Sequence, residues 1–299
     1  MNNIVMLIRR EFWENRSLWI APLVISGVLL LSAALGGIHV GEGNDISIGF
    51  LSPAERENLV DVDLPRSEQR YAKTLAVFTS IQMFTLGIAV FFYLLDALLT
   101  ERKDRSILFW KSLPISDAEV VGSKVLTGLV AAPVYVLLVS AATHILFALV
   151  WSLRSGGPPD SEMLAWDGST WLQVQAAFWM LAPAVIVWYL PLAGYALLVS
   201  VWARKNAFLW ALLPPASILA IEGLLRQSTH FGQWLLDRFV GVFRIVLSGP
   251  DRSASDEELG ELLRRVGDVF TDTDTWLGVL VAAVMFVVIV RFRRYRDDS

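Results

Sequence analysis

Long apolar stretches, separated by charged or turn-forming residues, dominate the chain. There are six of them, and they cover 18–40, 75–99, 125–151, 171–201, 207–225 and 276–290. A membrane core roughly 30 Å thick needs about 20 mainly apolar residues in helical form to cross it. Backbone groups in lipid must also find their hydrogen-bond partners within the same segment. The pattern therefore predicts an all-α integral membrane protein with six transmembrane helices.

Two segments allow more than one interpretation. The last stretch, 276–290, is short, but Trp276 and the arginines that follow it are typical interface anchors, so we expect a span there. The segment 231–247 is apolar enough for a seventh span, yet it contains three charged residues. We expect it to form an amphipathic helix at the membrane surface, within an outer helical region over 226–275. The first outer loop is also expected to contain a helix, because Ser52, Pro53 and Glu55 have the order of a capping box with a first-turn proline.

The composition agrees with a membrane protein and excludes several kinds of site. Hydrophobic residues make up 55% of the chain and charged residues only 18%, which leaves too little polar surface for a soluble domain of this length. The chain has no cysteine, so disulfides and thiolate metal sites are excluded. The three histidines lack the spacing of a zinc protease, and no metal site is expected.

The distribution of basic residues predicts the orientation. Lys and Arg exceed Asp and Glu before the first span, after the last span, and in the loops that follow the second and fourth spans. Short cytoplasmic loops carry such an excess. We therefore expect both termini on the cytoplasmic side. The six spans and their loops are expected to form a single transmembrane domain over 1–299.

The N-terminal segment 1–17 has the pattern of a helix that lies in the membrane interface. Ile8 and Phe12 fall on one side of this helix, whereas Arg9 and Arg10 face elsewhere. A simple surface anchor and a helix adjacent to a partner protein both fit this pattern.

The loop 101–119 carries the most specific signal in the chain. Ser116 and Glu119 are spaced as a capping box, which predicts a new helix there, and Pro114 interrupts the preceding segment. A short helix over 106–112 is thus isolated between two breaks. It is rich in apolar residues that face water, which favours either a protein partner or a position flat on the lipid headgroups.

The same loop resembles the hallmark segment of type-2 ABC transporter permeases. The resemblance rests on the charged run from Glu101 to Arg105, on the turn Leu113-Pro114-Ile115-Ser116, and on Lys124 at the start of the next span. It implies a permease of the bacterial inner membrane, usually an exporter, that pairs with a second copy of itself and binds two copies of a separate ABC ATPase. The implied coupling residues are Ser106, Ile107, Leu108, Phe109, Trp110, Lys111, Leu113 and Pro114, and the implied connecting helix carries Ile8, Arg9, Arg10 and Phe12.

No enzyme motif is present in the chain. The sequence lacks G-x-x-x-x-G-K-[ST], so ATP hydrolysis by the P-loop mechanism is not expected here, and ATP and Mg²⁺ are expected in the partner ATPase. It also lacks H-E-x-x-H and G-x-S-x-G. We expect no cofactor in this chain and no nucleic-acid partner, only membrane lipid and protein. The competing classes are a membrane scaffold or immunity protein without transport and, less favoured, an intramembrane enzyme.

Ionisable residues next to the spans are candidates for ion pairs. Asp96 is placed to contact Arg102 or Lys103, and Glu222 is spaced to pair with Arg226 one helical turn later. Charges at membrane depth also mark transport sites, so a transport or gating role is the alternative for both.

Polar and proline positions within the spans are candidates for a transport pathway. Thr79 and Gln82 lie about one turn apart on the second span, which suits either a cavity lining or hydrogen bonds between helices. Pro214 and Pro215 are expected to bend the fifth span, because proline removes a backbone donor.

Overall fold

The structure, a computed structural model, confirms a helical protein with membrane-spanning character. It describes residues 3–35, 38–40, 46–48, 65–104, 106, 112, 114–155, 167–226, 229–247, 264 and 266–295. Within these residues, six helices are long and apolar enough to cross a membrane. They are Ser17–Leu35, Tyr71–Lys103, Asp117–Leu153, Gly168–Trp202, Ala207–Leu224 and Thr273–Tyr295.

The chain forms two compact units, and several long helices contribute to both. Unit 1 comprises Met1–Trp19, Leu86–Val134 and Met180–Ser299. Unit 2 comprises Ile20–Thr85 and Tyr135–Trp179.

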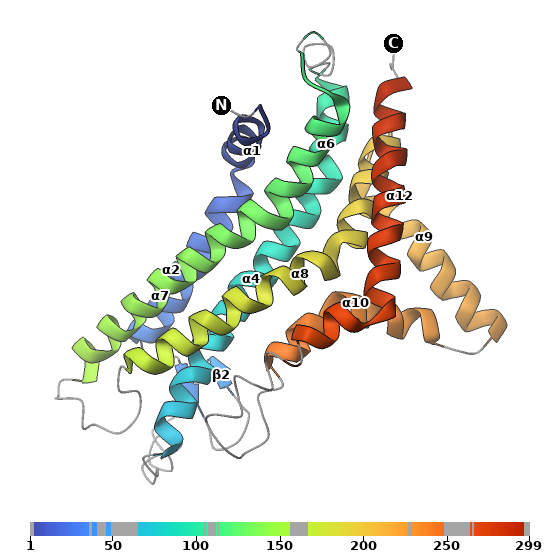
Figure 1. Cartoon of the computed structure of the whole chain (residues 1–299). Coiled ribbons are helices and arrows are strands. Elements are labelled where there is room, and N and C mark those ends of the chain that lie inside the picture. Colours follow the sequence, from blue (N-terminus) through green and yellow to red (C-terminus); the bar gives the residue numbers. More distant parts are fainter. Residues whose placement is uncertain are drawn as a thin grey trace. The chain divides into compact units, whose positions relative to one another are not determined.

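Unit 2 contains the parts of four helices that lie within its ranges. These helices are α2 (Ser17–Leu35), α4 (Pro65–Lys103), α7 (Ala132–Ser155) and α8 (Gly168–Trp202). In Figure 1, α2 and α7 run alongside one another. The rings of Phe78 and Phe147 pack edge to face with their centroids 5.0 Å apart, which joins α4 to α7 through aromatic contact.

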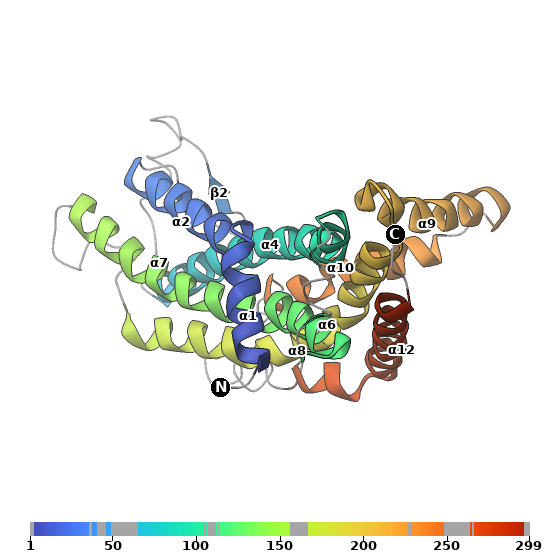
Figure 2. The same cartoon turned by 90° about the horizontal axis from the view of Figure 1, so that it is seen from above.

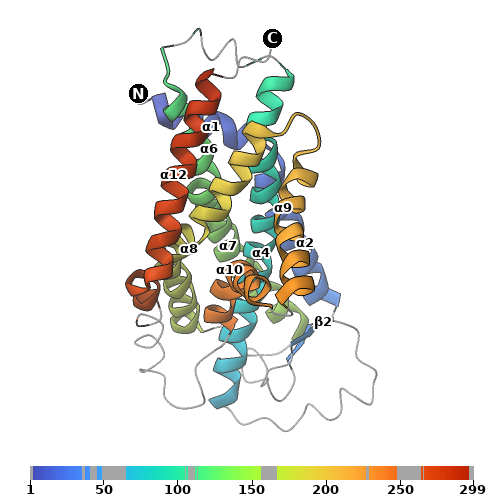
Figure 3. The ribbon, with the colours of Figure 1, turned by 90° about the vertical axis from the view of Figure 1, so that its right-hand side faces the viewer.

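Unit 1 contains the remaining helices and the second halves of α4 and α8. Its own elements are α1 (Asn3–Glu14), α6 (Asp117–Leu126), the π-helical turn η1 (Thr127–Ala131), α9 (Ala207–Ile221), the π-helical turn η2 (Glu222–Arg226), α10 (His230–Leu247) and α12 (Thr273–Tyr295). Figure 2 shows α1 beside α6, and Figure 3 shows α12 beside the second half of α8. The N-terminal helix and the C-terminal end of α12 therefore belong to the same unit.

Glycines allow two close helix contacts in unit 1. A Cβ on Gly194 of α8 would lie 3.4 Å from the sulfur of Met285 on α12. A Cβ on Gly128 in η1 would lie 3.1 Å from Val90 on α4. Small residues at such positions let helix backbones approach closely, which is the usual way that membrane helices pack.

The first predicted span is shorter than expected. Helix α2 ends at Leu35 rather than at residue 40, and Gly36-Gly37 follow it in the sequence. Strand β1 (Ile38–Val40) then pairs antiparallel with β2 (Ile46–Ile48). The prediction that the first span continues to residue 40 was wrong, because β-branched residues after two glycines favour a strand over a continued helix. The capping box predicted at 52–55 lies outside the described residues.

Two other helices are longer than the apolar stretches that predicted them. Helix α4 begins at Pro65, a residue suited to the first turn of a helix, and not at residue 75. Helix α12 runs through 23 residues and continues past residue 290 into the arginine-rich end. The short sixth stretch is therefore part of a helix of sufficient length, since arginine can reach the headgroups from the end of a span.

Side-chain caps mark where two of the helices begin. The Ser116 side chain accepts a hydrogen bond from the Glu119 N–H, and the Glu119 carboxylate accepts one from the Ser116 N–H at 2.8 Å, which confirms the predicted capping box. Asp167 caps α8 in a similar way. The hydroxyls of Ser169 and Thr170 and the backbone N–H of Thr170 hold the pKa of the Asp167 carboxyl well below its usual range.

Candidate functional site

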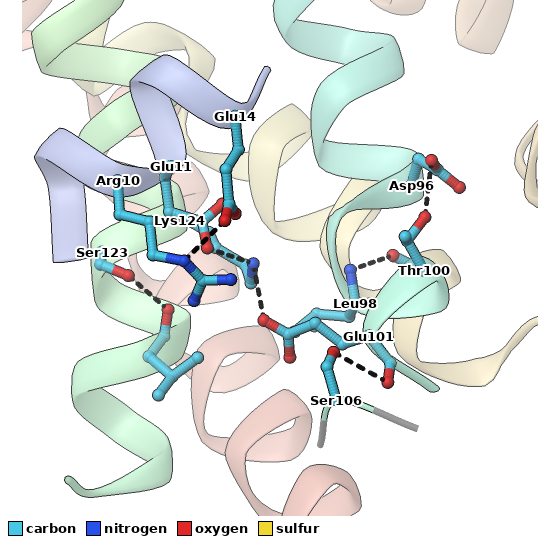
Figure 4. A network of polar contacts seen from close by, with 12 residues as sticks. Arg10, Glu11, Glu14, Asp96, Leu98, Thr100, Glu101, Ser106, Ser123 and Lys124 are labelled. Atoms are coloured by element: carbon cyan, nitrogen blue, oxygen red, sulfur yellow. Dashed lines mark hydrogen bonds and ion pairs between the residues drawn. The ribbon is translucent and has the colours of Figure 1, made fainter. Parts of the chain in front are cut away.

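Five charged side chains, four of them buried, form a cluster in unit 1, which we call the charge cluster. Its members are Glu11, Glu101, Asp117, Lys124 and Arg293. The Lys124 Nζ lies 2.7 Å from a Glu11 oxygen and 2.9 Å from a Glu101 oxygen. Arg293 pairs with the second Glu101 oxygen and lies 2.9 Å from Asp117. Figure 4 shows Lys124 between Glu11 and Glu101.

Four helices supply the charge cluster. Glu11 is on the face of α1 that also buries Leu7, one turn earlier. Glu101 is near the end of α4, Asp117 and Lys124 lie two turns apart on α6, and Arg293 is near the end of α12. The cluster therefore gathers residues that are far apart in the sequence at one end of unit 1.

The charge cluster is strongly shielded from water. The side chains of Lys124 and Arg293 are 2% exposed, and those of Glu11 and Glu101 are 8% and 10% exposed. Removing charges from water costs several kcal/mol for each ion, which only close pairing offsets. The Tyr93 hydroxyl adds a hydrogen bond of 3.0 Å to the second oxygen of Glu11. This pairing makes the relative positions of the four helices interdependent.

The charge cluster encloses both ends of the loop segment 102–116, whose first two residues belong to the last turn of α4. Glu101 directly precedes this loop and Asp117 directly follows it, and Arg293 binds them both. The loop's first residue, Arg102, donates to the carbonyl oxygens of Ser200 and Ala203 at 2.6 Å each. The base of the loop is thus fastened to α12 and to the end of α8.

The predicted coupling residues lie only partly within the described chain. Ser106 and Ser112 are helical positions, and the Ser106 hydroxyl donates to the Glu101 carbonyl oxygen at 3.3 Å. Pro114 is exposed. The remaining six, Ile107, Leu108, Phe109, Trp110, Lys111 and Leu113, lie outside the described residues, so their contact with a partner stays a prediction.

Helix α1 packs through side chains that the sequence pattern did not single out. Leu7 and Glu11 are buried. The predicted connecting-helix residues divide into half-buried Ile8 and Phe12 and exposed Arg9 and Arg10. The Arg10 guanidinium pairs with Glu14 at 2.7 Å on the exposed side of the helix.

The predicted ion pairs have different outcomes. Asp96 accepts a hydrogen bond of 2.7 Å from Thr100, one turn later, in place of the predicted contact with Arg102 or Lys103. Both Glu222 oxygens accept from the Phe231 N–H at the start of α10, at 3.1 and 2.9 Å. The side chain of Arg226 lies outside the described residues, so its pairing with Glu222 stays a prediction.

The prolines of α9 are accommodated within a continuous helix. Because Pro215 has no N–H, it cannot donate to the Ala211 carbonyl four residues earlier. The Tyr195 hydroxyl of α8 donates to that carbonyl at 2.8 Å. Pro214, its neighbour, is exposed. The Ala211 carbonyl, which Pro215 leaves without its usual helical donor, therefore links α9 to α8. A pathway role for the two prolines stays a prediction.

Thr79 and Gln82 belong to a second buried polar group, in unit 2, which we call the hydroxyl network. The Gln82 amide donates to Ser26 at 2.8 Å and to Thr143 at 3.2 Å. The Thr79 hydroxyl bonds Ser140 at 2.6 Å. All of these side chains are at most 7% exposed. The contacts connect α2, α4 and α7, which favours hydrogen bonding between helices over a cavity lining for Thr79 and Gln82.

His144 links the hydroxyl network to a fourth helix. Its Nε2 lies 3.2 Å from the Thr79 hydroxyl, and its Nδ1 lies 3.0 Å from the Gln175 amide of α8. The His144 side chain is fully buried. His144, on α7, is therefore hydrogen-bonded to both α4 and α8.

Replacing His144 with leucine is expected to lower the free energy of unfolding by about 1–3 kcal/mol, because the buried Gln175 amide then loses its acceptor. Denaturant titration of the purified protein in detergent measures this change. Ser152→Ala, at an exposed position of the same helix, is the control and should stay within about 0.5 kcal/mol of the unmodified protein. Equal stability of the two variants would contradict the buried network.

The sequence pattern missed the charge cluster as a site. The pattern presents Lys124 only as the residue at which a helix enters the membrane, and it presents Glu11 and Arg293 only as charges near the spans. The available signal was the presence of ionisable residues within helices that adjoin apolar spans, since such residues need partners. Those partners are not neighbours in the sequence.

A comparison with models of known protein families finds no match to this chain, and a comparison with curated proteins finds no similar sequence. By its geometry, the charge cluster can hold α1, α4, α6 and α12 together with both ends of the loop segment between α4 and α6.

Proposed function

We propose that the chain is the membrane-spanning permease subunit of an ABC transporter, driven by a separate ATPase. In this proposal it acts as a homodimer in the bacterial inner membrane, binds two ATPase copies and exports its substrate. Six apolar helices and the resemblance of the loop 101–119 to the hallmark segment of type-2 permeases support it. The charge cluster provides a further and independent argument.

The observation that carries the proposal is the attachment of both ends of the loop 102–116 to the charge cluster. Lys124 joins Glu101 to Glu11 of α1, and Arg293 of α12 binds Glu101 together with Asp117. A force applied to the loop is therefore passed to α1, α4, α6 and α12 at once. Buried ion pairs suit this task, because separating them is costly and the helices must move together.

The same geometry agrees with the proposed orientation. Helix α1, the base of the loop and the C-terminal end of α12 meet in the charge cluster at one end of unit 1 (Figure 1). An even number of spans brings both termini and this loop to the same side of the membrane. The excess of Lys and Arg on these segments favours the cytoplasmic side, where ATP is available.

Transport would then follow from a motion of the partner. ATP and Mg²⁺ would be held by the ATPase, whose closure would press on the segment 106–112 and on α1. The charge cluster would convey this displacement to the ends of the spans, and the permease would change between inward and outward access.

Co-purification with an ATPase tests the proposal. The gene beside this one is expected to encode a protein with a Walker motif, and the two proteins are to be expressed together with a tag on the permease alone. The ATPase should be retained on the tagged protein in detergent, and reconstituted vesicles should couple ATP hydrolysis to transport. A tagged, folded permease that retains no ATPase would contradict the proposal and favour a scaffold or immunity protein.

A further inference from the structure

Arg238 on α10 is a buried cation without a hydrogen-bonded partner in the described part of the chain. Its side chain is 4% exposed, and its Nε is fully buried with no acceptor. The guanidinium carbon lies 4.4 Å above the ring of Trp188 on α8. Stacking on an indole face leaves the edge of a guanidinium, which carries its donors, available for an anion.

Two carboxylates, Asp272 and Asp274, act on Arg238 from a distance without pairing with it. One Asp272 oxygen accepts from the Asp274 N–H at 3.3 Å and the other accepts from the Thr275 hydroxyl at 3.3 Å, so Asp272 caps α12. Among the described residues, neither Asp272 nor Asp274 lies within ion-pair distance of Arg238. Burial lowers the pKa of Arg238, and these two carboxylates oppose that shift without reversing it.

The surrounding helices hold the guanidinium in place. The Trp188 indole donates to the Arg238 carbonyl at 2.9 Å, and the Tyr189 hydroxyl donates to the Phe239 carbonyl at 2.8 Å. Gly278 of α12 leaves room for the side chain, because a Cβ at this position would collide with the Arg238 Nη2. The position of the cation is therefore built into the packing of α8, α10 and α12.

Arg238 lies near the opposite end of α12 from the charge cluster. At ~1.5 Å per helical residue, the start of α12 at Thr273 is about 30 Å along the axis from Arg293, which equals the rough thickness of the hydrocarbon core, and Gly278 is about 22 Å from Arg293. Trp276 and Trp234, which are 55% and 50% exposed, are of the residue type that gathers at headgroup level. These indoles favour headgroup level for the parts of α10 and α12 near Arg238.

We propose that Arg238 binds the phosphate of a phospholipid headgroup in a site formed by α8, α10 and the start of α12. The planar guanidinium matches two phosphate oxygens at once. Phe239, the next residue of α10, is 45% exposed and offers apolar surface to the acyl chains, which a free phosphate would not use. The site does not depend on the proposed transport function.

Lipid-dependent thermal stability of the full-length protein in detergent tests this site. Phosphatidylglycerol is expected to raise the melting temperature of the unmodified protein, whereas inorganic phosphate or diacylglycerol at the same concentration is not. Arg238→Gln should weaken the response to phosphatidylglycerol at least about tenfold in apparent affinity, because a charge-assisted hydrogen bond is lost. Arg204→Gln removes an exposed arginine of the turn before α9 and should respond as the unmodified protein does.

A second variant keeps the site testable should Arg238→Gln fail to fold. Arg238→Lys retains the charge without the planar fork and is expected to bind phosphatidylglycerol more weakly than arginine does. Equal responses of the unmodified protein and Arg238→Lys would overturn the site. Equal stabilisation by inorganic phosphate would assign Arg238 to a free anion, and equal stabilisation by diacylglycerol would assign the effect to the acyl chains; either result would also overturn it.

Discussion

Replacing Lys124 with methionine is expected to lower the free energy of unfolding by about 3–5 kcal/mol, the largest effect of any single substitution proposed for this protein. Methionine fills a similar volume, so packing changes little. The loss arises because Glu11 and Glu101 then remain buried without the cation that lies 2.7 and 2.9 Å from them. Denaturant titration in detergent micelles measures the change.

An exposed ion pair on α1 supplies the matched control. Glu14→Gln breaks the pair with Arg10, whose side chain is 41% exposed, and should cost less than about 1 kcal/mol. The double variant Glu11→Gln with Lys124→Met should regain part of the stability lost by Lys124→Met alone, since one unpaired charge is gone. A Lys124→Met protein as stable as Glu14→Gln would mean that the cluster is open to water.

Truncating Phe109 and Trp110 together to alanine is expected to abolish transport and to weaken binding of the ATPase. Burial of one aromatic side chain at a protein interface commonly contributes about 2 kcal/mol or more, roughly a 30-fold change in affinity. The protein should remain inserted, because both residues lie outside the six apolar helices. Co-purification of the ATPase and transport into vesicles are the two measurements.

Aromatic residues elsewhere in unit 1 control for a general loss of stability. Trp234→Ala with Trp276→Ala removes two half-exposed indoles from α10 and α12 and should leave ATPase binding unchanged. Normal ATPase binding and normal transport in the Phe109 and Trp110 double variant would instead favour a helix that rests on the headgroups.

Local features of this protein could be predicted from the sequence because they depend on neighbouring residues. The six apolar helices follow from hydropathy over about 20 residues, a property that every stretch carries by itself. The start of α6 follows from Ser116 and Glu119, which are three residues apart. The end of α2 at Leu35 was missed, although Gly36-Gly37 and the β-branched residues beyond them carried that signal.

The candidate sites depend on contacts between helices. Glu11 meets Lys124 across 113 residues, and Glu101 meets Arg293 across 192. Hydropathy and capping patterns hold no information on which residues so far apart in the sequence come into contact. The partner of Asp96 shows the same limit, since Thr100 and Arg102 were both within reach in the sequence and only the hydrogen-bonding geometry selected Thr100.

The sequence by itself determined that this is a helical membrane protein and where most of its spans lie, because the cost of placing polar groups in lipid acts on each segment separately. Only the tertiary structure decided which charges are paired, that Gln82 and His144 bond neighbouring helices, and that Tyr195 compensates for Pro215. The physical reason is that a buried polar group must be satisfied by whichever side chain the packing brings within about 3 Å, and packing is a property of the whole fold.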